Sequence, residues 1–256
     1  MKIFPIAVAA ALMLTSMAGA NVALAATEIR IVSSSGLKEV MLDLAPEFER
    51  TTGHKLVMEF DSSAGVKRKV EAGANFDIVF VTPPMIADLA RQGKLAPGSG
   101  TEIARVGLGA AIRAGAPRPD IGTTETFRQT LLNAKSIMHN KEGQSGIYMS
   151  ALLERLGIAE QIRPRIILKT VAGPVAENIA RGEAELGFQL ISEIVTVKGA
   201  ELLGPLPSEL QTFVVYAAAF AAGMRDPAAA NELLRFLATP TSAQVMKKYG
   251  MESLAR

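Results

Sequence analysis

A short run of serines follows an apolar, β-branched stretch near the beginning of the chain. Ile29–Val32 predicts a β-strand, and Ser33, Ser34 and Ser35 come directly after it, followed by Gly36. From there, apolar residues recur at the spacing of one buried helix face. The turn between the strand and the helix therefore offers hydroxyl groups and unpaired backbone N–H groups, which together suit a small anion.

Two further polar turns of this kind lie along the chain. Lys55–Phe60 alternates in polarity and predicts a second strand, after which a serine pair precedes a helical segment. A third polar turn follows the short strand predicted at Ser136–Met138. An ordinary helix cap without a ligand is the alternative for each turn. The hydroxyl-bearing candidates for ligand binding are Ser34, Ser35, Ser62, Ser63 and Ser145.

Three titratable side chains lie beside these turns. Lys38 falls in the first turn of the first helix, and Lys67 in the first turn of the second. An ammonium group there would bind a carboxylate, although lysines more often lie on solvated helix faces. His139 lies at the end of the strand that precedes Ser145, and it is a candidate acid–base group, with an ordinary loop histidine as the alternative.

The bulk composition excludes several classes of protein. The 256 residues contain 27 Lys plus Arg and 25 Asp plus Glu, without a basic run that is interleaved with aromatic residues, so we do not expect nucleic-acid binding. The absence of cysteine excludes disulfides, iron–sulfur clusters and zinc–thiolate sites. Only two histidines are present, and their spacing is not that of metal ligands. We therefore expect neither a metal nor a cofactor.

Residues 1–25 have the pattern of a secretory signal peptide. Met1–Lys2 is a short basic start, Ile3–Met17 is almost wholly apolar, and Ala23–Ala25 fits the small-x-small cleavage rule. An uncleaved membrane anchor is the alternative, but the apolar run is short for a membrane span. We therefore expect a secreted, periplasmic protein.

Strands alternate with helices along the rest of the chain. This alternation predicts parallel sheets with helices on both faces, whose ligands bind beyond the carboxyl ends of the strands. Asp77–Val81 is a continuous apolar run, as expected for a central parallel strand. Thr212–Phe220 predicts a strand that returns to the first half of the fold. The serine-bearing turns should consequently face one common cleft.

The order of these features resembles the periplasmic solute-binding proteins of the molybdate-binding type, over nearly all of the mature chain. The resemblance implies an α/β, type II two-lobed periplasmic binding protein fold, in which each lobe is a parallel-rich sheet flanked by helices. It places lobe 1 at residues 26–109 plus 210–256 and lobe 2 at 110–209, with hinges near 109 and 210. The segments that carry it are Ser33–Met41, Phe60–Asp77, Ser145–Tyr148, Ala184–Gly187 and Lys248–Gly250.

The resemblance to molybdate binders is weaker at the ligand. The family serine that opens the first helix corresponds to Gly36, whereas the second family serine corresponds to Ser63. Two family contacts through backbone amides fall near Ser145 and Ala172. The family tyrosine falls near Leu190, whose side chain cannot donate a hydrogen bond. Together with the added lysines, this altered donor set favours a small organic carboxylate over molybdate.

Two functions follow from the resemblance. The first is a monomeric binding protein of an ABC-type importer, which closes on a small anion and delivers it to a membrane permease. The second is an isomerase on the same fold, because aconitate isomerase also resembles this family. Such an enzyme would interconvert cis- and trans-aconitate, or a similar unsaturated polycarboxylate, by proton transfer. His139 and Lys38 are then its candidate catalytic residues.

Overall fold

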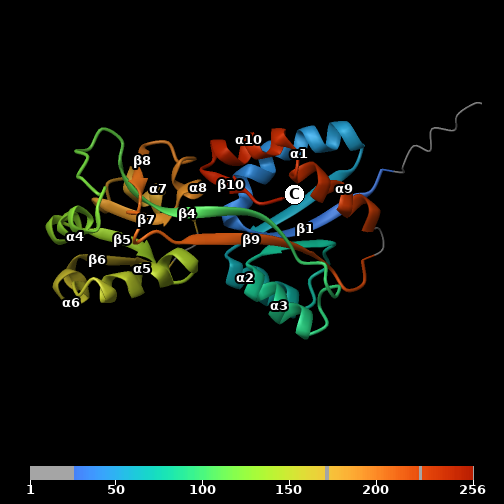
Figure 1. Ribbon diagram of the computed structural model, residues 1–256, viewed down its shortest axis with the longest axis horizontal. Helices are drawn as coiled ribbons and strands as arrows, with labels where there is room; N and C mark the ends of the chain where they lie inside the picture. Colours follow the sequence, from blue (N-terminus) through green and yellow to red (C-terminus); the bar gives the residue numbers. More distant parts are fainter. Residues whose placement is uncertain (1–25, 171–172, 225–226, 256) are drawn as a thin grey trace, which may run out of the picture.

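A computed structural model describes residues 26–170, 173–224 and 227–255 of the chain (Figure 1). The predicted signal peptide at residues 1–25 lies outside this part. No helix in the described ranges is long and apolar enough to cross a membrane. The strands are β1 (Glu28–Ser34), β2 (Lys55–Asp61), β3 (Ile78–Val81), β4 (Thr101–Arg113), β5 (Ile137–Asn140), β6 (Ile166–Lys169), β7 (Leu186–Leu190), β8 (Ala200–Pro205), β9 (Phe213–Phe220) and β10 (Met251–Ser253).

Helices connect most of these strands, as the alternating sequence pattern predicts. Two 3-10 turns, η1 (Ser35–Leu37) and η2 (Arg163–Arg165), complete the described elements. The α-helices are α1 (Lys38–Thr52), α2 (Ser63–Glu71), α3 (Pro83–Arg91), α4 (Thr124–Asn133), α5 (Gln144–Arg155), α6 (Ala159–Ile162), α7 (Val175–Ala180), α8 (Ile191–Ile194), α9 (Pro227–Leu237) and α10 (Pro240–Lys248).

The described strands form one mixed sheet. Its hydrogen-bonded order is β2-β1-β3-β9-β4-β7-β5-β6, and β8 and β10 both pair with β4. β1 is parallel to β2 and β3, and β5 is parallel to β6 and β7, whereas β9 and β4 are antiparallel to their neighbours. The predicted α/β class with parallel-rich sheets is therefore confirmed. The central position predicted for the apolar strand β3 is also correct, since it lies between β1 and β9.

β4 joins the two halves of the sheet. Up to Gly107 it pairs with β9 and β10, and from Leu108 onward it pairs with β7 and β8. Figure 1 shows β4 and β9 crossing the middle of the molecule, between a half with β1–β3 and a half with β5–β8. This change of partners lies close to the hinge predicted near residue 109. The division into lobes at residues 109 and 210 stays a prediction.

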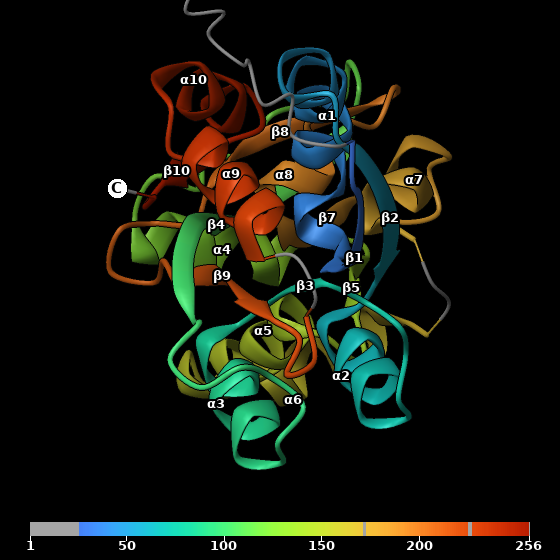
Figure 2. The same ribbon diagram turned by 90° about the vertical axis from the view of Figure 1, so that its right-hand side faces the viewer.

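Helices cover both faces of the first half. α1, α9 and α10 lie on one face of the sheet, and α2 and α3 lie on the other, as Figures 1 and 2 show from two sides. The larger apolar core includes Phe48 of α1 and continues along β4 through Val106 to Phe127 of the second half. Val66 and Leu89 belong to a separate core under α2 and α3. The side chains of β3 therefore alternate between the two cores.

Several short elements escape the sequence patterns. α6, α8 and β10 were not predicted, because each spans only three or four residues and shows no clear period. β8 was not predicted either, because its last residues, Gly204 and Pro205, are typical of a break; among the described strands it pairs only with β4. Edge strands of this kind tolerate proline, since the missing N–H need not face a partner.

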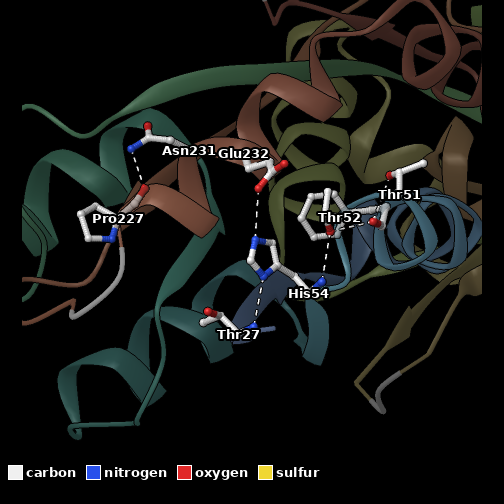
Figure 3. Close-up of polar contacts among 8 residues, drawn as sticks. Thr27, Thr51, Thr52, His54, Pro227, Asn231 and Glu232 are labelled. Carbon is white, nitrogen blue, oxygen red and sulfur yellow. Dashed lines mark hydrogen bonds and ion pairs between the residues drawn. The ribbon is translucent and has the colours of Figure 1, made fainter. Parts of the chain in front are cut away.

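Buried His54 connects the beginning of β1 to α9 (Figure 3). Its ring is 1% exposed, and the backbone N–H of Thr27 donates to Nδ1 at 3.1 Å. This bond requires the tautomer with its hydrogen on Nε2, and that nitrogen lies 3.1 Å from the Glu232 carboxylate. The Phe48 ring lies 6.1 Å away, measured between ring centroids. Both ring nitrogens are therefore occupied by contacts that hold the fold together.

We predict that His54→Phe lowers the free energy of unfolding by about 1–3 kcal/mol, because the phenyl ring offers neither nitrogen to its two partners. Urea unfolding followed by circular dichroism measures the change. Glu232→Gln is the matched control, since the amide oxygen still accepts from Nε2, and it should cost less. An equal loss in the two variants would contradict the role assigned to the ring.

Candidate functional site

Two serine hydroxyls meet where β1 and β2 end. The strands are parallel, with Ser34 opposite Asp61, so the segments that follow them begin side by side. The Ser34 Oγ lies 2.8 Å from the Ser63 Oγ, and Ser34 is 1% exposed. The structure therefore brings together two of the hydroxyls that the sequence assigned to one site.

Local hydrogen bonds distinguish the serines of these turns. Ser62 is the N-cap of α2, where its Oγ accepts from the Gly65 N–H at 3.0 Å, so this hydroxyl serves the helix. The Ser34 side chain makes no capping bond. When two hydroxyls bond to each other, only one of their two hydrogens is used. The pair of Ser34 and Ser63 consequently retains one hydrogen that can be donated to a ligand.

The second half of the molecule reaches the same turn through α8. The Ser35 Oγ donates to Glu193 Oε1 at 3.4 Å, and the Ser192 Oγ donates to the Gly36 carbonyl at 3.0 Å. Ser192 and Glu193 follow Leu190, the last residue of β7. The carboxyl ends of strands from both halves therefore meet at η1 and α8, which is where sheets of this kind bind ligands.

Glu193 is a partly buried carboxyl group. Burial raises its pKa to about 7, and the hydrogen bond from Ser35 opposes this rise only in part. Burial also raises the pKa of the Tyr216 hydroxyl, and the nearby charge of Glu193 adds to that effect. Near neutral pH, Glu193 is therefore present in both its acid and its ionised form, so it can donate or accept a proton.

Gly36 leaves space for two neighbouring side chains. A Cβ at this position would lie 2.1 Å from the Tyr216 hydroxyl oxygen and 3.1 Å from Leu190 Cδ1. Tyr216 comes from β9, and Leu190 comes from the end of β7. The resemblance to molybdate binders predicts a serine at this position. Glycine is found instead, because the side chains of Tyr216 and Leu190 occupy the space that a side chain would need.

The two predicted lysines have carboxylate partners of their own. Lys67 lies 2.9 Å from Glu71 and 2.7 Å from Asp88, and these partners raise its pKa. Lys38 is exposed and lies 3.7 Å from Glu39. Lys67 therefore forms ion pairs between α2 and α3, and its contact with a ligand stays a prediction. A contact between Lys38 and a ligand stays a prediction.

The predicted residues His139 and Ser145 take part in none of the contacts described above. His139 is 1% exposed, its Nδ1 lies 2.8 Å from the Asn140 carbonyl, and burial lowers its pKa. Ser145 lies in the first turn of α5, beyond the carboxyl end of β5, and is 5% exposed. Because β5 and β7 are parallel, Ser145 lies at the same edge of the sheet as Leu190. Ala172 lies outside the described residues. Their roles stay predictions.

Sequence reasoning missed Ser192, Glu193, Tyr216 and Gln189. The Gln189 Oε1 accepts from the Ala176 N–H at 2.9 Å, while its Nε2 is buried without a partner among the described residues. Polar residues inside apolar strands could have drawn attention to Gln189 and Tyr216. An acidic residue just after a strand's carboxyl end could likewise have indicated Glu193.

Comparison with known proteins identifies the family. A family model described as bacterial extracellular solute-binding protein matches residues 29–252. The chain belongs to this family. It is 30% identical to the aconitate isomerase of Pseudomonas sp over 234 residues, which cover 88% of each chain. It is 26% identical to the molybdate-binding protein ModA of Escherichia coli (strain K12) over 231 residues, or 87% of this chain and 88% of the relative.

Solved structures of such binding proteins share the fold. The periplasmic molybdate-binding protein of Azotobacter vinelandii matches with a TM-score of 0.70 at 20% identity, covering 87% of this chain and 98% of that one. The sulfate-binding protein SubI from Mycobacterium tuberculosis H37Rv gives a TM-score of 0.71 at 16% identity, covering 89% and 87%. The expected type II periplasmic binding protein fold is confirmed.

We predict that Glu193→Gln makes stability less dependent on pH. The folded protein keeps the Glu193 proton up to about pH 7, whereas the unfolded chain loses it near the ordinary value of 4.5. The folded state therefore binds more protons between these values, and the contribution of Glu193 to stability falls as the pH rises through them. Urea unfolding at a series of pH values across this interval should give a smaller fall for the variant. Equal falls would contradict the assignment.

Proposed function

We propose that this member of the solute-binding family binds a small organic carboxylate between its two halves. The observation that carries the proposal is the contact between the buried Ser34 hydroxyl and the partly buried Ser63 hydroxyl at the beginnings of two helical segments. Helix beginnings have unpaired N–H groups and a partial positive charge. An anion can therefore be stabilised there without a cationic side chain.

The other groups at this turn favour a carboxylate. Gly36 and Leu190 bring no hydroxyl, whereas Glu193 brings a carboxyl group that is partly protonated near neutral pH. A protonated carboxyl donates a strong hydrogen bond to an ionised carboxylate, while an ionised Glu193 would repel any anion. Because a carboxylate is a stronger base than sulfate, it shares a proton with Glu193 more readily.

The proposal includes the cellular setting of a solute-binding protein. Residues 1–25 are removed on secretion, and the mature protein acts in the periplasm as a monomer. An ABC-type membrane permease then receives the bound ligand. The family assignment over residues 29–252 supports this setting, and the sequence pattern of the first 25 residues supports secretion.

Isothermal titration calorimetry with citrate, trans-aconitate, molybdate, tungstate and sulfate tests the binding function. We predict binding of a carboxylate, and we expect Ser63→Ala to weaken it about 10- to 100-fold, because a hydrogen bond to a charged group contributes about 1.5–3 kcal/mol. Ser208→Ala changes an exposed serine outside the site and should bind as the wild type does. Heat from none of the anions would refute binding, and tightest binding of molybdate would refute the carboxylate.

A second function, isomerisation of an unsaturated polycarboxylate, is favoured by Glu193. The relative at 30% identity is an aconitate isomerase. In such a reaction, a base removes a proton from the methylene carbon of the substrate, the double bond shifts, and an acid returns a proton to the far carbon of the three-carbon unit. A carboxyl with a pKa of about 7 can take the first proton and supply the second.

Proton NMR of trans-aconitate with the purified protein tests this second function. We predict that cis-aconitate signals appear, and that Glu193→Gln lowers turnover about 100-fold or more, as expected for loss of a general acid–base group. Calorimetry should detect a much smaller change in affinity. His139→Ala is the comparison, and loss of turnover there but not in Glu193→Gln would return the acid–base role to His139. An unchanged spectrum would refute the isomerase and leave the binding function untouched.

A further inference from the structure

Tyr216 has a buried side chain whose hydroxyl has no hydrogen-bond partner in the described part of the chain. The residue lies in β9 within an apolar stretch and is 2% exposed. No described residue forms a hydrogen bond with its hydroxyl, and the hydroxyl oxygen is not among the fully buried polar atoms that lack a partner. The oxygen at the end of this buried side chain is therefore not fully enclosed by the described residues. Tyrosine hydroxyls of buried side chains normally bond to a protein group, a water or a ligand, so this one is free to donate to a ligand.

The neighbours of this hydroxyl place it at the serine-bearing turn. Its oxygen lies 2.1 Å from where a Cβ of Gly36 would stand. Gly36 does not have a positive φ, so close approach of the tyrosine, rather than backbone conformation, explains the glycine. The charge of Glu193 also acts on the Tyr216 hydroxyl, which places it near the contact between Ser35 and Glu193.

From this geometry we propose that the Tyr216 hydroxyl donates a hydrogen bond to a carboxylate of the ligand, beside the point where Ser35 and Glu193 of the two halves meet. The inference rests on the proposed binding function and names a residue that determines its specificity. The environment keeps the phenol protonated, since burial and the nearby carboxyl both raise its pKa. Tyr216 is therefore a donor, and it selects for ligands that present an acceptor at this point.

Gly36 and Tyr216 are a matched pair in this arrangement. Any side chain at position 36 would push the hydroxyl away from the turn. Leu190, the neighbour on the other side of Gly36, offers no donor. A serine at position 36 would supply a hydroxyl from η1. Here Tyr216 supplies a hydroxyl from β9 instead, because its longer side chain extends into the same space.

The test compares Tyr216→Phe with Tyr148→Phe, since each removes a single phenol oxygen. The Tyr148 hydroxyl donates to the Leu210 carbonyl, so it has a partner within the protein. Calorimetry with trans-aconitate, and with molybdate if the wild type binds only molybdate, gives the affinity. Urea unfolding without ligand gives the stability.

We expect Tyr216→Phe to weaken binding about 10- to 100-fold, the range for loss of a hydrogen bond to a charged ligand. Its stability without ligand should equal or exceed that of the wild type, because an unpartnered hydroxyl has been removed. Tyr148→Phe should show the reverse pattern, with unchanged affinity and lower stability. Unchanged affinity in Tyr216→Phe would overturn the inference while the binding function stands, and binding of no anion by the wild type would overturn both.

Gly36→Ala gives an independent check. The added Cβ displaces the Tyr216 hydroxyl, so this variant should lose affinity by the same route as Tyr216→Phe. The loss in the double variant should then be smaller than the product of the two single fold-changes, as for residues that act through one contact. Fully multiplicative losses would contradict the proposed pairing.

Discussion

The parallel pairing of β1 with β2 is the constraint on which the site depends. Its register places Ser34 opposite Asp61, so the chain leaves both strands at the same level. The Ser34 and Ser63 hydroxyls meet there because two helical segments begin side by side. A register shift of one residue would turn Ser34 to the other face of the sheet and separate the pair. Burial of β1 between β2 and β3 makes such a shift costly.

Electrostatics at this turn depend on neutral donors. Lys67 is bound between two carboxylates, and Lys38 lies exposed beside Glu39. An anion at the turn would therefore be stabilised by hydroxyls and helix N–H groups, which are already oriented before the ligand arrives. Glu193 adds a group whose charge depends on its surroundings, because its pKa of about 7 lies close to neutrality. The protonated form of Glu193 can donate a hydrogen bond to an anionic ligand, whereas its ionised form would repel the ligand.

Much of the local structure could be predicted from the sequence. The strand, serine turn and helix at Ser33–Met41 follow from a change of hydrophobic period at a run of polar residues, and the structure has β1, η1 and α1 there. The same pattern located β2 and α2. The parallel-rich α/β class follows from the alternation of such units. These features depend on residues close together in the chain, which is why they can be predicted from the sequence.

The composition of the site was less predictable, because it depends on residues far apart in the sequence. Glu193 reaches Ser35 across more than half of the chain, and Tyr216 reaches Gly36 from a strand in the middle of the sheet. The direction of Lys67 depends on the rotation of α2 about its axis, which the sequence pattern leaves open. Burial of His139 likewise follows from which face of β5 it occupies. Tertiary packing determines which side chains from distant parts of the sequence meet at the site.

A crystal structure of the protein with its tightest-binding anion tests the central claim most directly. The account predicts electron density for the anion within hydrogen-bonding distance of the Ser34 and Ser63 hydroxyls, between η1 and the beginning of α2. Density elsewhere, for example in the groove of about 870 Å³ lined by Arg118, Gln211 and Glu252, would contradict it.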